Sequence, residues 1–298
     1  MSQDNGAHVE DGATTDASLA SRAKNPKKNS PKWWLIALAV VVVVAVIAGA
    51  AFAFGGKKDS KNAASSGIYA DTVTIGLKLA PTNLDIRNTA GSALDQILIG
   101  NVYEGLVARD SKNQVVPAIA SSWETSKDGL TYTFHLNKNM TFSNGDKLDA
   151  EDVAWSINEL IAKDYHDADA LAAVDKVEAK DADTVVITLK SANSNLLWTL
   201  TGRPGLVFDK DAKYDLKTQA IGSGPYIVSK FVENSSITLK ANDKYWGKNK
   251  AKTPTVVVKY LADDNAAVNA LKSGDVQVLA PITENLAEPF KSDSANYT

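Results

Sequence analysis

Residues 116–156 read VPAIASSWETSKDGLTYTFHLNKNMTFSNGDKLDAEDVAWS, and the pattern of this stretch decides the fold. Residues 130–136 alternate along the chain, with Tyr132 and Phe134 on one side and polar residues on the other, which predicts a half-buried strand. The preceding Lys-Asp-Gly at 127–129 is a tight-turn sequence, because Asp and Gly tolerate a positive φ. Together with an extended segment at 123–126, these residues predict a hairpin.

A second turn and a capped helix follow the hairpin. The turn is Asn-Gly-Asp at 144–146. Asp149 stands at the N-cap position and Asp152 follows three residues later, a variant of the capping box. Apolar residues from Val153 onward then recur on one helical face. We therefore predict a helix over residues 150–163.

The same stretch resembles the signature region of the family 5 extracellular solute-binding proteins of ABC importers, the oligopeptide, dipeptide and nickel-binding type. Four linked blocks at the spacing of that family carry the resemblance: PAIASSW (117–123), DGLTYTFHL (128–136), FSNG (142–145) and AEDVAWS (150–156). Three further strings extend it: NVYEGLV (101–107), GSGPY (222–226) and LKANDKYW (239–246). Ile86 stands where the family has Pro, and Ser223 where it has Thr. An ordinary α+β hairpin–helix unit is the alternative.

The resemblance implies an α/β fold, the first lobe of a type II periplasmic-binding-protein fold with mixed sheets and flanking helices. It covers residues 71 to about 279, so we expect residues 71–298 to form solute-binding lobe I, with an inserted subdomain at about 110–220. Members of the family have two lobes, and we expect the second lobe to be absent and the chain to be truncated. Within the lobe, the patterns predict a strand at 71–79 and an amphipathic helix at 94–106.

The first 70 residues of the sequence predict a membrane anchor. Residues 33–54 are uninterruptedly apolar and would form a helix of roughly 33 Å, enough to cross a bilayer. Residues 1–32 are polar and basic toward their end, which predicts a disordered cytoplasmic tail, and residues 55–70 predict a flexible linker. We therefore expect a single-pass protein of the cell membrane whose binding domain is extracellular. A cleaved signal peptide is the alternative to an uncleaved signal-anchor.

Composition excludes several classes of protein. The chain has 298 residues and a formal net charge of −3, which gives no electrostatic case for nucleic-acid binding. It contains no Cys, which excludes disulfides, thiol catalysis and a lipidated N-terminal Cys. Its three His argue against a histidine-rich metal site. One of them, His166, lies among several Asp residues, where a solvated acidic loop is favoured over a cation site.

No motif indicates an enzyme. The sequence has no G-x-S-x-G, no P-loop and no H-E-x-x-H. Ser21 and Lys24 match an S-x-x-K pattern, but they fall in the predicted tail, and we interpret the match as chance. We therefore expect no catalytic residues, no cofactor and no metal ligands.

The resemblance also implies how a ligand is bound. Relatives close two lobes over the ligand, and the peptide binders pair with it backbone to backbone. This lobe's contribution is expected from two loops that we predict at strand ends, with glycines that allow a close backbone approach. The aromatic residue after the second loop is the favoured pocket aromatic. The expected ligand-binding residues are Ala80, Pro81, Thr82, Asn83, Gly222, Ser223, Gly224 and Tyr226.

The function that these patterns favour is the membrane-anchored substrate-binding component of an ABC importer. Its expected partners are a peptide or other small solute, the permease subunits, and the bilayer through residues 33–54. The alternatives are a sensory protein or an inert truncated remnant with the same lobe fold, or a binder of nickel complexes or sugars. Since much of the ligand-selecting part would lie in the other lobe, we expect weak binding by this chain alone.

Overall fold

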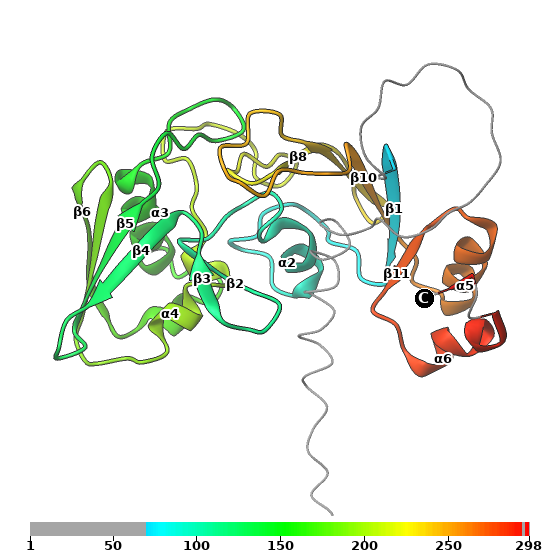
Figure 1. Ribbon diagram of the computed structural model, residues 1–298, viewed down its shortest axis with the longest axis horizontal. Coiled ribbons are helices and arrows are strands. Elements are labelled where there is room, and N and C mark those ends of the chain that lie inside the picture. The colour runs from blue at the N-terminus through cyan, green and yellow to red at the C-terminus, as the bar shows by residue number, and fades with distance from the viewer. Residues whose placement is uncertain (1–69, 294–295, 298) are drawn as a thin grey trace, which may run out of the picture. The chain divides into compact units, whose positions relative to one another are not determined.

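The computed structural model describes residues 70–293 and 296–297, which form three sheets with short helices between them (Figure 1). The strands are β1 (Thr72–Leu77), β2 (Val107–Arg109), β3 (Val115–Pro117), β4 (Ala120–Thr125), β5 (Thr131–Leu136), β6 (Val174–Asp181), β7 (Thr184–Leu189), β8 (Tyr226–Val232), β9 (Ser236–Ala241), β10 (Thr255–Tyr260) and β11 (Val278–Ala280). The α-helices are α2 (Ser92–Leu98), α3 (Ala150–Ala162), α4 (Leu196–Thr199), α5 (Asp264–Ser273) and α6 (Glu284–Ala287). Short 3-10 helices are η1 (Ala168–Leu171), η2 (Arg203–Gly205) and η3 (Glu288–Asp293).

The predicted membrane anchor lies outside the described residues. Residues 1–32 and 33–54, and the predicted linker up to residue 69, are not among them. Within 70–293 and 296–297, no helix is long and apolar enough to span a membrane.

The largest sheet has the strand order β11-β1-β10-β9-β8. β1 runs parallel to both of its neighbours, so the ends of β1, β10 and β11, at Leu77, Tyr260 and Ala280, lie together. We call this side of the sheet the carboxyl edge. β9 is antiparallel to both β10 and β8, so β8 runs in the same direction as β1. Its first residue, Tyr226, therefore lies at the opposite side, which we call the amino edge.

One face of this sheet carries one of the hydrophobic cores. Ile75, Ile237 and Val258 are fully buried there, and they share a cluster with apolar residues of α2. α2 ends at Leu98, so the prediction of a helix over 94–106 is wrong in its second half. Gly100 has a φ of 73°, and the carbonyl oxygens of Asn101 and Val102 accept hydrogen bonds from the N–H groups of residues 226 and 224 instead of continuing the helix. Tertiary contacts thus override the helical pattern.

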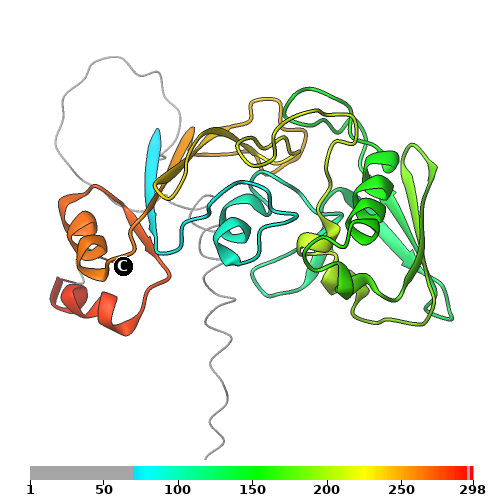
Figure 2. The same cartoon turned by 180° about the vertical axis from the view of Figure 1, so that it is seen from behind.

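The second sheet, in the order β4-β5-β7-β6, packs against α3 (Figure 2). The predicted hairpin is confirmed: β4 and β5 pair across a turn in which Gly129 has a φ of 70°. The inward row of β5, including Phe134, is buried as its alternation predicts. The capping box of α3 is also confirmed, with Asp149 and Asp152 bonding each other's backbone. These elements share one core cluster, and the expectation of an inserted subdomain at about 110–220 stays a prediction.

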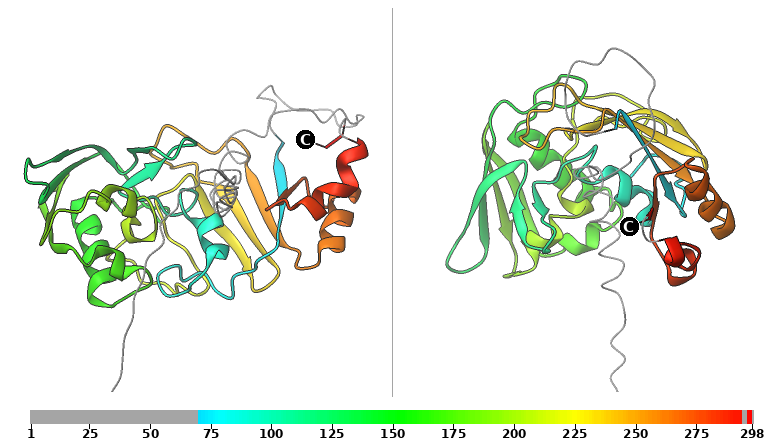
Figure 3. Two further views of the ribbon diagram at one scale, coloured as in Figure 1. Left: turned by 90° about the horizontal axis from the view of Figure 1, so that it is seen from below. Right: turned by 45° about the vertical axis from the view of Figure 1, so that its right-hand side comes forward.

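At the other end of the described chain, α5 and α6 lie beside the short strand β11 (Figure 3). The cap residue Asp263 precedes α5, and its side chain accepts from the Ala266 N–H; Gly274, with a φ of 80°, follows the last residue of the helix. Ala267, Leu279 and Leu286 form a small apolar cluster between these elements. This cluster positions the segment that leaves the carboxyl edge.

Candidate functional site

The carboxyl edge combines exposed apolar side chains with a shallow pocket. Leu79, just after β1, is 56% exposed, and Ile282, just after β11, is 54% exposed. At the rim of the pocket, Lys78 Nζ lies 2.8 Å from Asp264 Oδ1 in an exposed ion pair. The pocket between the strand ends and the two helices is lined by Gly76, Leu77, Lys78, Leu261, Asp264, Ala267, Leu279, Ala280, Pro281 and Leu286.

The predicted loop at 80–83 leaves this edge directly after β1. Asn83 shapes it, because its Oδ1 accepts from the Asp85 N–H at 2.8 Å and from Thr89 Oγ1 at 2.8 Å. Pro81 is buried, Ala80 and Asn83 are partly exposed, and Thr82 is exposed. The hydrogen bonds of Asn83 therefore fix the conformation of the loop, and Thr82 is exposed to solvent.

Sequence reasoning missed Tyr260 at the same edge. Its hydroxyl is buried and has no hydrogen-bond partner among the described residues. Burial raises the pKa of this hydroxyl, so it stays a neutral donor. The β10 pattern identifies a strand residue, but no local signal shows that its hydroxyl lacks a partner.

The second predicted loop lies at the amino edge and is closed. Gly222, Ser223 and Gly224 are all buried. A Cβ added at Gly222 would lie 2.0 Å from the Val102 carbonyl oxygen. The glycines do permit a close backbone approach, as their type predicts, but the approaching backbone is the chain's own. Any part of these residues in ligand contact stays a prediction.

Tyr226 is likewise engaged within the protein. Its side chain is 1% exposed, and its hydroxyl donates to the Thr253 carbonyl oxygen at 3.0 Å. Burial raises its pKa to about 12. Residues 222–225 directly precede β8, which begins at Tyr226, so this loop lies at the amino end of a strand and not at a carboxyl end. The structure places the two predicted loops at opposite edges of one sheet and does not bring them together.

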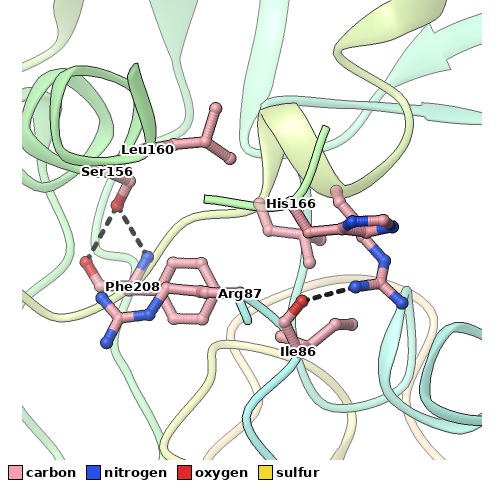
Figure 4. A pocket seen from close by; sticks show the side chains of 8 residues that line it. Ile86, Arg87, Ser156, Leu160, His166 and Phe208 are labelled. Atoms are coloured by element: carbon pink, nitrogen blue, oxygen red, sulfur yellow. Dashed lines mark hydrogen bonds between the residues drawn. The ribbon is translucent and has the colours of Figure 1, made fainter. Parts of the chain in front are cut away.

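A separate pocket, lined by both apolar and polar side chains, lies between η2, α3 and the residues before α2 (Figure 4). Arg203 is buried there, and its Nε lies 2.7 Å from Asp95 Oδ1, while Nη1 donates to the Ile86 carbonyl oxygen. Burial raises the pKa of Asp95 although Arg203 opposes the shift. His166 is exposed, with Nε2 3.5 Å from Asp167 Oδ1. The ion pair and the hydrogen bond of Arg203 connect η2 with α2 and with the residues before it.

Metal ligation receives no support from the part of the chain that the structure describes. It contains no group of three or more His, Asp or Glu side chains placed to hold a metal ion. Residues 164–169, the acidic loop around His166, are mostly exposed. The loop therefore has the geometry of a solvated surface segment.

Residues 114–297 match the family model described as bacterial extracellular solute-binding proteins, family 5 Middle. Protein XP55 of Streptomyces lividans is 32% identical over 239 residues, covering 77% of this chain and 42% of that protein. Di/tripeptide-binding protein 2 of Pseudomonas aeruginosa is 28% identical over 260 residues, covering 76% of this chain and 48% of that protein.

Solved structures show the same likeness. NikZ from Campylobacter jejuni, in complex with Ni(L-His), has a TM-score of 0.67 and 25% identity, and the match covers 75% of this chain and 45% of that one. The chain thus spans less than half the length of the relatives it matches. The predicted α/β fold with mixed sheets is confirmed as that of a periplasmic binding protein.

Proposed function

Because the chain belongs to the family 5 bacterial extracellular solute-binding proteins, we propose that it is the membrane-anchored substrate-binding component of an ABC importer. In this proposal the carboxyl edge of the large sheet forms one wall of the ligand site. The relatives are transport proteins rather than enzymes, and the same assignment extends to this chain. The permease would receive the ligand from it.

One observation carries the proposal: three strand ends and two exposed apolar side chains meet at a single edge. α/β folds place ligands at the carboxyl ends of strands, where loops are free to vary. Leu79 and Ile282 flank the pocket there, and both are more than half exposed. At the amino edge, by contrast, Gly222, Ser223 and Gly224 are buried. The proposed contact surface is therefore residues 78–83 and 280–282.

Peptides are the favoured ligand class. Loop 80–83 presents backbone and a small hydroxyl side chain rather than a cluster of charges. Backbone pairing binds peptides without selecting side chains, which suits such a surface. One relative is named for di- and tripeptides, and another was solved with Ni(L-His), which makes a nickel–histidine complex the second candidate.

The anchor and the orientation are part of the same proposal. Residues 33–54 form the proposed bilayer span, with residues 1–32 cytoplasmic and the described lobe outside. The support is the uniform apolar run and the basic residues before it. A flexible linker at 55–70 would let the lobe stand away from the bilayer.

Site-specific photo-crosslinking tests the ligand surface. A photoreactive phenylalanine analogue replaces Thr82 in the full chain, held in lipid nanodiscs and exposed to a mixed peptide library. The matched control places the same analogue at Thr125, an exposed residue at the end of β4. Mass spectrometry is expected to find peptide adducts at residue 82 at least several-fold above those at 125. Equal labelling at both positions contradicts the proposed surface.

A parallel nickel–histidine arm separates the two ligand classes. Nickel–histidine that suppresses peptide labelling at residue 82, and is itself retained by the chain, would favour the second candidate. Retention of peptide alone favours the first.

A further inference from the structure

A buried carboxyl group outside the candidate site joins three segments at the amino edge. Glu104 is 8% exposed. Its Oε1 accepts from the Tyr245 hydroxyl at 2.6 Å, and its Oε2 accepts from Ser223 Oγ at 3.3 Å. Its backbone carbonyl accepts from the Val207 N–H at 3.1 Å. One side chain therefore links the segment after α2, the 222–224 turn and the segment after β9.

Hydrogen bonds fix the position of the 222–224 turn. The Gly224 N–H donates to the Val102 carbonyl oxygen at 2.9 Å, and the Asn242 side chain donates to the Gly224 carbonyl oxygen at 3.0 Å. Ser223 sits between the two glycines, fully buried, with its hydroxyl directed to Glu104. Hydrogen bonds to Val102, to Asn242 and to the Glu104 carboxyl therefore hold the turn in place.

Burial decides the protonation of Glu104. It raises the pKa to about 7, although the hydrogen bonds from Tyr245 and Ser223 lower it. Among the described residues, the hydroxyl groups of Tyr245 and Ser223 are the side-chain groups that affect the pKa of the Glu104 carboxyl, and no charged side chain contributes to its pKa shift. The pKa of Tyr245 is raised by its burial and by Glu104, so this tyrosine remains a donor.

We propose that Glu104 is a protonation-dependent latch that holds the 222–224 turn closed when its carboxyl is neutral and loosens it when the carboxyl is ionised. An ionised carboxylate needs more hydration than two hydroxyl donors supply, and opening the turn admits water. The turn lies outside the proposed contact surface at residues 78–83 and 280–282, so the latch does not depend on the proposed function.

The direction of the pH effect follows from the raised pKa. The stabilisation is fully present below the ordinary Glu value of 4.5 and is lost as pH rises through about 7. Between pH 5 and pH 8 this one group changes the closed-to-open ratio by roughly 70-fold, if the open carboxyl regains its ordinary pKa. Such a change is well within the range of hydrogen-exchange measurements.

Amide hydrogen exchange on the full chain tests the latch without any ligand. Protection of the Gly224 N–H, corrected for the intrinsic exchange rate, is expected to fall by tens of fold from pH 5 to pH 8 in the wild type. Glu104→Gln cannot ionise; its amide oxygen can accept from one of the two hydroxyl groups and its amide nitrogen can donate to the other. This variant is expected to hold protection nearly constant. Glu233→Gln, at an exposed turn, is the matched control and should follow the wild type. A wild type without pH response, or the same response in Glu104→Gln, overturns the proposal.

A direct titration guards against a variant that fails to fold. Carbon-13 NMR of the Glu104 carboxyl in the wild type is expected to show a midpoint near pH 7, and Tyr245→Phe should move it higher by removing a donor to the ionised form. A midpoint near 4.5 removes the basis of the latch. Failure of peptide crosslinking at residue 82 would affect the proposed function and leave both measurements valid.

Discussion

At the carboxyl edge of the large sheet, Leu79 and Ile282 are more than half exposed, whereas at the amino edge Gly222, Ser223 and Gly224 are buried. Both edges carry loops that the sequence assigns to the ligand. At the carboxyl edge the backbone after β1 is accessible to a ligand. At the amino edge the backbone of Asn101 and Val102 packs directly against the glycines. A glycine-rich turn can therefore serve internal packing as well as ligand contact, and only the tertiary structure distinguishes the two.

The largest expected effect is steric and concerns the closed edge. Gly222→Ala places a Cβ 2.0 Å from the Val102 carbonyl oxygen, so the backbone must shift. We expect the free energy of unfolding to fall by about 3 kcal/mol. Gly202→Ala is the matched control, because its nearest atom lies 3.6 Å away. Denaturant unfolding monitored by tryptophan fluorescence compares them, and equal stability of the two variants would show that the amino edge is not tightly closed.

The next largest expected effect is electrostatic and concerns Glu104, at the same amino edge. Glu104→Gln is expected to raise the free energy of unfolding at pH 8 by about 2 kcal/mol and to leave it nearly unchanged at pH 5. The wild type carries a buried carboxyl whose pKa is about 7, so its ionised form destabilises the closed state above that pH. Denaturation curves at both pH values check this, and a variant that is less stable at pH 8 contradicts it.

A pair of tyrosines compares the edges directly. Tyr226→Phe removes a hydroxyl that donates to Thr253, and we expect a loss of about 1 kcal/mol because the carbonyl is left without its donor. Tyr260→Phe removes a hydroxyl without a partner in the described structure, so stability should be unchanged or slightly higher. Thermal unfolding of the two variants measures the difference, and the reverse ranking would refute the assignment of the two hydroxyl groups.

The smallest expected effect lies at the open edge. Leu79→Asn replaces an exposed side chain, so the free energy of unfolding should change by less than about 0.5 kcal/mol. Peptide crosslinking from residue 82 should nevertheless weaken in this variant, because the apolar flank of the pocket is lost. Unchanged crosslinking would remove Leu79 from the proposed surface.

Local patterns predict much of this fold. The alternation of β5, the turn at Gly129 and the capping box of Asp149 are short-range features, and the structure confirms each of them. The end of α2 is different, because the backbone beyond Leu98 bonds to residues 224 and 226, far away in the chain. Periodicity carries no information about such partners.

The candidate site likewise combines features that local sequence patterns predict with features that depend on long-range contacts. The loop after β1 is recognisable from sequence, since a strand end followed by a Pro-containing loop is a local signal. The burial of Ser223 against Glu104 and the unpartnered hydroxyl of Tyr260 arise from long-range contacts. Neither is visible in the spacing of residues, which is why the two edges look alike in the sequence and differ in the structure.

The most direct test of the account maps peptide binding by NMR on the isotope-labelled full chain. Amide shifts on addition of a mixed peptide library are followed at both edges of the large sheet. The account predicts perturbations at residues 78–83 and 280–282, and none at residues 222–224. Perturbations confined to residues 222–224, with the carboxyl edge unchanged, would contradict it.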